Sequence, residues 1–250
     1  MRLPPLMRKL LYFFILSSTV QAFAQTEVAQ LASSRQITKK ETANLDSQDV
    51  RYLPLFGSRE TLQKQLVKNA DFVEQCITNF STKEEASKFF AERGWEYLSE
   101  GLLDTATYRF NLAYLLNPNN MDVYWGLGSI SYQRNNFEQS AAFLRKGLSL
   151  SPDNTVLMVD VATVQIACFK EKKDCNDIDD ALALLEKSVK LDSTNANAWL
   201  KYSIAEFQLE HYDKAWDYLH KCRVLDLSFV DLNYVQELMA KKEDPVGFFK

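Results

Sequence analysis

The stretch that decides the fold runs from Trp125 to Pro152, with the sequence WGLGSISYQRNNFEQSAAFLRKGLSLSP. A similar order of small, apolar and aromatic residues precedes it between Gly94 and Pro118. The prolines that close the two stretches are 34 residues apart, and Asn, Ser or Asp flanks each of them, as in loops between helices. A fixed period of this length is typical of a protein built from repeated helical hairpins.

The positions shared by the two stretches form a signature. The earlier stretch holds Gly94, Tyr97, Ala106, Phe110 and Ala113, and the later one holds Leu127, Gly128, Tyr132, Ser140, Leu144 and Gly147. This pattern resembles the tetratricopeptide repeat, W-x-x-L-G-x-x-Y followed by A-x-x-x-F, A and P over 34 residues. Two further copies follow, in which Ala162 and Ser203 stand where the signature has glycine and the closing proline is missing.

The resemblance implies an all-α fold, a right-handed superhelical solenoid of about four helix-turn-helix repeats over residues 82–227, the third with an insertion at 169–177. One helical hairpin cannot bury its apolar face alone, so hairpins stack, and the ends of the array need polar caps. We therefore expect an N-terminal capping helix over 59–80 and a C-terminal capping helix and tail over 228–250.

The N-terminus has the layout of a secretory signal peptide. A basic start is followed by an apolar run from Leu10 to Val20 and by a small-x-small pattern that places cleavage between Ala24 and Gln25. The apolar run is shorter than the roughly 20 residues that a membrane span needs. We therefore expect removal of residues 1–24, a flexible or extended linker over 25–58, no integral membrane span in the mature chain, and export to a bacterial periplasm or, otherwise, secretion.

The sequence offers few groups for chemistry. The net charge of −4 gives no basic footprint for nucleic acid. No glycine-rich phosphate loop or nucleophile elbow is present, and the acidic run at 177–180 is placed to cap a helix. His211 and His220 are not at the spacing of metal ligands on one helix. We expect surface histidines, and we expect no catalytic residue, no metal site and no cofactor.

Two of the four cysteines lie close together in the third repeat. Cys168 ends its first helix, and Cys175 lies in the insertion before its second helix. Export would let a disulfide between them persist, and closing so short a loop would stabilise the fold by roughly 2–3 kcal/mol. The alternative is a pair of free thiols. Cys222 occupies a helix-packing position and is expected to be buried.

The family resemblance also implies where a partner would bind, because the first helix of each pair lines the concave side of such solenoids. The inward positions include Val159 and Thr163, and the residues predicted to form the partner-binding groove are Trp95, Leu98, Trp125, Tyr132, Ile166, Leu200, Ile204 and Phe207. This surface is apolar and aromatic, as binding hot spots are. The slots that clamp a C-terminal carboxylate in some repeat proteins hold Ala91, Trp95, Trp125 and Ser129, which do not suit that mode. The alternative is a groove filled by the protein itself, either by residues 25–58 or by tight superhelical packing.

These features favour a non-catalytic scaffold or assembly factor of the cell envelope, which binds a segment of another protein. Two alternatives remain open. The same aromatic residues could serve a glycan- or lipid-binding envelope protein, or a solenoid could carry an enzyme with carboxylates on its concave face. The predicted inward surface contains no cluster of Asp, Glu or His, which weighs against the enzyme.

Overall fold

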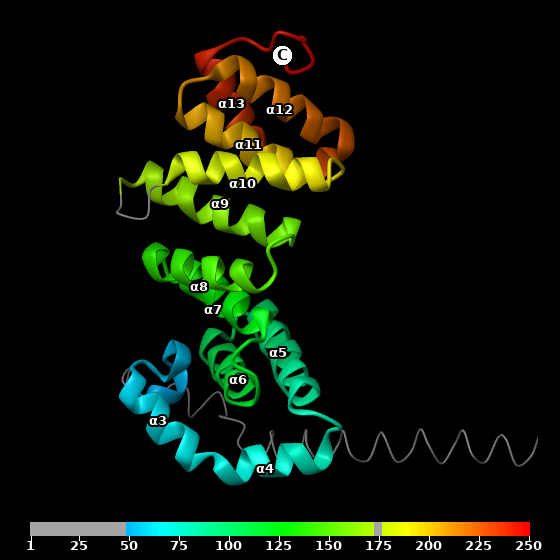
Figure 1. The fold of residues 1–250 in the computed structure, drawn as a ribbon. Coiled ribbons are helices and arrows are strands. Elements are labelled where there is room, and N and C mark those ends of the chain that lie inside the picture. The colour runs from blue at the N-terminus through cyan, green and yellow to red at the C-terminus, as the bar shows by residue number, and fades with distance from the viewer. Residues whose placement is uncertain (1–48, 173–176) are drawn as a thin grey trace, which may run out of the picture. The chain divides into compact units, whose positions relative to one another are not determined.

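The chain is all-helical in its computed structural model, which describes residues 49–172 and 177–250; within these ranges every regular element is a helix (Figure 1). The predicted all-α class of stacked hairpins is confirmed. The predicted signal peptide, its cleavage site at Ala24 and Gln25, most of the predicted linker, and Cys175 lie outside the described residues. The chain divides into two compact units, residues 1–118 and 119–250, so the first predicted repeat belongs to one unit and the other three to the second.

The first unit is built around one hairpin. Its elements are η1 (Val50–Tyr52), η2 (Pro54–Phe56), α3 (Arg59–Lys68), α4 (Ala70–Asn79), α5 (Lys83–Ser99) and α6 (Leu103–Leu116). The helices α5 and α6 approach most closely at Gly94, where an added Cβ atom would lie 2.7 Å from the Phe110 ring. The small residue at this position therefore lets the two helices pack, as the repeat pattern requires.

The N-terminal capping helix predicted over 59–80 is two helices, α3 and α4, divided at Asn69. The backbone leaves helical geometry at Asn69, with φ of −104° and ψ of 17°, and the Asn69 side-chain amide joins its backbone N–H in donating to the Gln65 carbonyl oxygen. The linker predicted over 25–58 also differs, because residues 49–57 are ordered as η1 and η2 against α6. We call residues 49–57 the strap.

The second unit contains three hairpins and a capping helix. Its elements are α7 (Met121–Gln133), α8 (Phe137–Leu150), α9 (Thr155–Lys170), α10 (Ile178–Leu191), α11 (Ala196–Gln208), α12 (Tyr212–Leu225), η3 (Leu227–Phe229) and α13 (Leu232–Lys241). Each first helix begins at an asparagine whose side chain accepts a backbone N–H: Asn120 for α7, Asn154 for α9 and Asn195 for α11. A shared cap at the same point of each repeat fixes where each hairpin starts.

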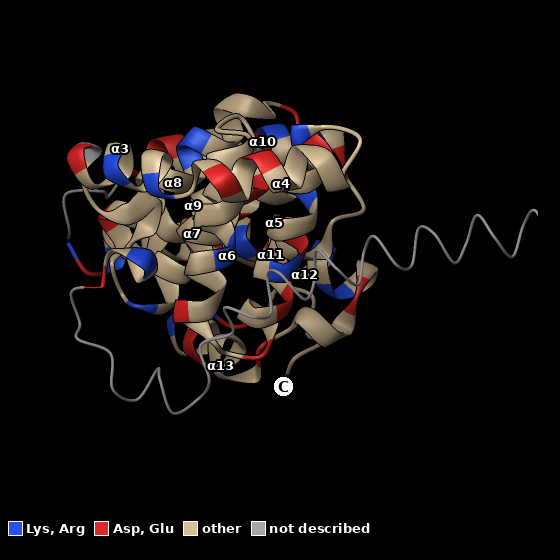
Figure 2. Cartoon of the chain, turned by 90° about the horizontal axis from the view of Figure 1, so that it is seen from below, with Lys and Arg blue, Asp and Glu red and all other residues tan. Residues whose placement is uncertain are grey.

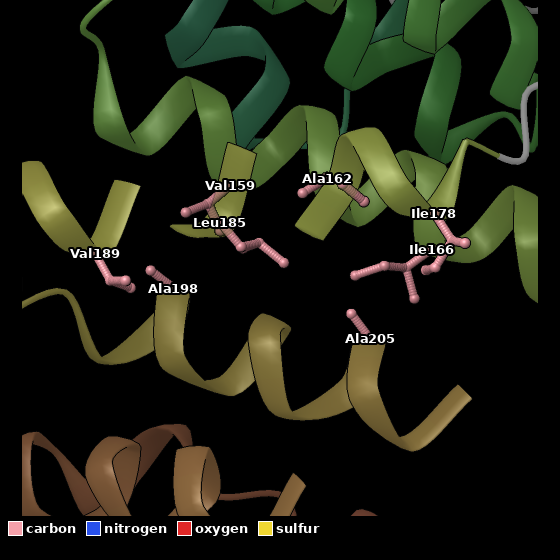
Figure 3. Packing of buried hydrophobic residues seen from close by; sticks show 9 residues of the cluster. Val159, Ala162, Ile166, Ile178, Leu185, Val189, Ala198 and Ala205 are labelled. Carbon is pink, nitrogen blue, oxygen red and sulfur yellow. The ribbon is translucent and has the colours of Figure 1, made fainter. Parts of the chain in front are cut away.

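Clusters of buried apolar side chains join neighbouring hairpins of the second unit. Figure 3 shows side chains of α9, α10 and α11 converging, with Ile166, Leu185 and Ala205 among them. A second cluster joins α11, α12 and α13 around Trp216, which is fully buried. Buried serines add hydrogen bonds where two helices of a hairpin approach: Ser140 Oγ donates to the Gly128 carbonyl at 2.8 Å, and Ser203 Oγ to that of Ala215 at 2.6 Å.

Candidate pocket on the first helices of the repeats

A pocket of about 260 Å³ opens on the second unit. The first helices of three successive hairpins supply most of its wall, and the N-cap and first two turns of α13 close it. The lining residues are Tyr132 of α7; Thr163, Ile166, Ala167 and Lys170 of α9; Lys201, Ile204, Phe207 and Gln208 of α11; and Asp231, Asn233, Tyr234 and Glu237 at α13. A concave site formed by equivalent helices of consecutive repeats is a natural place for a ligand to bind.

The structure brings half of the predicted groove residues together. Tyr132, Ile166, Ile204 and Phe207 all line the pocket, although they are spread over 76 positions of sequence. Leu200 packs in the core of α11, α12 and α13. The role of these predicted groove residues in binding a partner stays a prediction.

Trp125 forms a hydrogen bond within the protein. Its indole Nε1–H donates to Asp160 Oδ2 at 2.6 Å, which ties α7 to α9. Burial raises the pKa of Asp160, while the Trp125 hydrogen bond and the charge of Lys201 oppose that rise. This hydrogen bond could not be predicted, because Asp160 has neither a partner nearby in sequence nor a place in the repeat signature.

The pocket is more polar than the sequence pattern predicted. Lys201 is half-buried in its wall, and burial lowers the pKa of this ammonium group while the charge of Asp160 opposes the change. Lys170 adds a second cation, and Asp231 and Glu237 add carboxylates from the α13 side. The predicted apolar and aromatic surface is therefore mixed, with an apolar strip bordered by charges of both signs.

The remaining predicted groove residues belong to the first unit. Trp95 is half-buried and packs edge-on against Phe110, with ring centroids 5.5 Å apart, and Leu98 is buried. The strap is fastened to α6 in the same unit by Asn111, whose Oδ1 accepts the Leu55 N–H at 2.9 Å. Asn111 Nδ2 donates to the carbonyl oxygens of Arg51 and Leu53 at 3.0 and 2.8 Å. This part of the predicted linker thus packs on the second helix of its hairpin.

His220 is not the surface residue that the sequence suggested. Its side chain is 12% exposed, packs against the rings of Trp216 and Phe249, which also contact each other, and shares a 2.8 Å hydrogen bond with Asp244. Asp244 is 1% exposed and also accepts the backbone N–H groups of Val246, Phe248 and Phe249. Together these contacts fasten the C-terminal tail to α12. His211 is 54% exposed, as expected, and pairs with Glu206.

Neither of the two cysteines that are free among the described residues has a reactive thiol. Cys76 and Cys222 are free and buried, and burial raises the pKa of each thiol to about 11. Cys168 is fully buried on α9 and is disulfide-bonded. Its predicted partner, Cys175, lies outside the described residues, so the pairing itself stays a prediction.

The described residues show a surface of mixed charge, no candidate metal site and no candidate membrane span. In the view of Figure 2, Lys and Arg are mixed with Asp and Glu along the helices. Within residues 49–172 and 177–250, no group of three or more His, Cys, Asp or Glu side chains could hold a metal ion. Over the same ranges, no helix has both the length and the apolar character to cross a bilayer.

Comparison with known proteins identifies the fold. No protein-family model matches the sequence, and a sequence search of curated proteins finds no match either. Solved structures do match. MamA from Desulfovibrio magneticus is 19% identical (63% of this chain, 86% of that one, TM-score 0.52), and PilF of Pseudomonas aeruginosa is 16% identical (67% and 79%, TM-score 0.52). YrrB, a tetratricopeptide-repeat protein with an unusual peptide-binding site, is 15% identical (81% and 98%, TM-score 0.51). This chain has the fold of tetratricopeptide-repeat proteins.

Proposed function

We propose that the chain is a non-catalytic scaffold that binds a segment of another protein in the pocket of its second unit, and that it acts in the cell envelope after export. The observation that carries the proposal is the pocket itself. Three equivalent helices and α13 shape a cavity in which an apolar strip of Ile166, Ile204 and Phe207 is bordered by polar groups. Ligand sites combine apolar lining with polar groups that fix the orientation of the ligand, and this pocket offers both.

The fold supports the same proposal. Stacked hairpins present an extended surface whose width exceeds that of one repeat, and such surfaces suit polypeptide segments. One structure of similar fold, YrrB, is a protein with a peptide-binding site. Export rests on the sequence of residues 1–24. It predicts that the mature protein, recovered from the envelope fraction, begins at Gln25.

The pocket can be tested with two variants of one helix. Thr163→Arg places a long cation inside the pocket, whereas Val156→Arg places the same side chain on an exposed part of α9, where Val156 is 48% exposed. A photo-reactive amino acid at Tyr132 would capture the partner in cells, and mass spectrometry would identify it. We expect the purified partner to bind the wild type and Val156→Arg alike, and to lose binding to Thr163→Arg. Equal binding to all three proteins would refute the proposed site.

A further inference from the structure

The pocket contains a half-buried cation that no described residue pairs. Lys201 lies on α11 between buried Leu200 and half-buried Tyr202, and its side chain lines the cavity beside Ile204. Among residues 49–172 and 177–250, none accepts a hydrogen bond from its ammonium group or forms an ion pair with it. An ammonium carries three donors, and removing them from water is costly without an acceptor.

Among the described residues, Asp160 is the carboxylate whose charge acts on Lys201, and one of its two oxygens is already hydrogen-bonded. Its Oδ2 atom accepts the Trp125 indole N–H at 2.6 Å. The attraction of Asp160 opposes the lowering of the Lys201 pKa by burial, but it supplies no direct acceptor for the ammonium group. The positive charge stays directed at the cavity.

The positive and negative side chains of the pocket come from different helices. Lys170 ends α9 and Lys201 belongs to α11, whereas Asp231 caps α13 and Glu237 belongs to it. Asp231 is already used, because its Oδ1 accepts the Asn233 N–H at 2.8 Å and caps α13. The wall formed by α9 and α11 is therefore cationic and apolar, and a ligand that lies on it meets a lysine ammonium beside aliphatic and aromatic side chains.

We infer that the bound segment presents an acidic side chain to Lys201 while an adjacent apolar side chain packs on Ile204 and Phe207. This inference rests on the proposed function and names the chemistry of its partner: an acidic–apolar stretch of polypeptide. A carboxylate would complete the hydrogen bonding of the ammonium with a charge-assisted bond, which is roughly twice as strong as a neutral one. A neutral side chain at the same point would leave the ammonium partly desolvated and unpaired, so the site selects against it.

The cavity has room for this arrangement. Its volume of about 260 Å³ is far above the roughly 10–15 Å³ needed to admit one water molecule, so side chains can enter it. Because Lys201 is half-buried, salt screens its charge less than that of an exposed lysine. Discrimination between acidic and neutral segments should therefore persist at physiological ionic strength.

A random peptide display library, selected against the purified protein, tests the inference. We expect enriched peptides to carry Asp or Glu next to Leu, Phe or Tyr. Lys201→Gln should abolish this preference, and Lys201→Arg should keep it. The control Glu237→Gln removes a pocket anion and should leave the acidic preference intact. For the best peptide, replacing its acidic residue by the amide should weaken binding to the wild type about tenfold or more, and should barely affect binding to Lys201→Gln.

The other outcomes separate the two claims. Peptides that require an open pocket, and so are lost with Thr163→Arg, but show no acidic preference or keep it in Lys201→Gln would overturn the inference and leave the proposed function standing. Selection that yields no peptide sensitive to Thr163→Arg would overturn both.

Discussion

The attachment of the C-terminal tail to α12 should depend on the carboxylate of Asp244. In the folded protein, Asp244 accepts backbone N–H groups of Val246, Phe248 and Phe249 at 2.8–2.9 Å, and it shares a hydrogen bond with His220. Burial by itself would raise the pKa of Asp244, but the hydrogen bonds outweigh it and lower the pKa to about 2. The tail is thus stabilised by the ionised form of this side chain.

The size of the effect follows from the pKa. A fall from 3.8 to about 2 corresponds to about 2 kcal/mol of stabilisation. Because the folded pKa lies below the unfolded value, this stabilisation is fully present above about pH 4 and is lost as the pH falls through about 2. We expect Asp244→Asn, which keeps the shape and removes the charge, to cost about 2 kcal/mol at pH 7 and much less at pH 2.

Hydrogen–deuterium exchange measures the tail directly. A loss of about 2 kcal/mol corresponds to roughly 30-fold faster exchange of the amides of residues 246–249 if they exchange by local opening. Asp213→Asn is the matched control, because Asp213 also contacts the tail through an ion pair with Lys242, but is 74% exposed. Exposed pairs contribute little. The same exchange rates in Asp244→Asn and wild type at pH 7 would refute the assigned role of Asp244.

Three further predictions concern packing and backbone. Gly128→Ala should lower the free energy of unfolding by about 1–3 kcal/mol in urea titration, because the added Cβ atom would lie 2.5 Å from Leu144 Cδ2; an unchanged midpoint would mean that the helices can separate freely there. Glu210→Gly should raise stability by about 0.5 kcal/mol in the same assay, since residue 210 has a left-handed backbone with φ of +62°. Asn111→Ala should release residues 49–57 and expose them to limited proteolysis, whereas cleavage at the wild-type rate would show that Asn111 does not fasten them.

The hairpins could be predicted because their determinants are local and periodic. Gly94 and Gly128 recur where two helices touch, and the loops at Pro118 and Pro152 mark the period. The same logic placed Tyr132, Ile166, Ile204 and Phe207 on one face, and the pocket that they line follows from stacking equivalent helices.

The features that could not be predicted from the sequence depend on contacts that do not recur from one repeat to the next. The helix break at Asn69 is marked by neither proline nor glycine, and there the side-chain amide and the backbone N–H both donate to the Gln65 carbonyl oxygen. The His220–Asp244 pair joins residues 24 apart, and the strap bond of Asn111 to Leu55 spans 56. Lys201 and Asp160 are ordinary surface residues by type. Only the fold places Lys201 in the wall of the pocket and Asp160 beside Trp125.

The manner in which Asn111 holds the strap has an evolutionary consequence. All three of its bonds go to main-chain atoms of Arg51, Leu53 and Leu55, so this fastening is indifferent to what those three side chains are. As far as this fastening is concerned, relatives of this chain can vary the side chains at positions 51 and 53. Position 55 is restricted, because its backbone is left-handed with φ of +49° and because proline there would have no N–H to donate. The length of the segment in relatives should be invariant, since inserting or deleting one residue would shift every carbonyl out of reach of the amide.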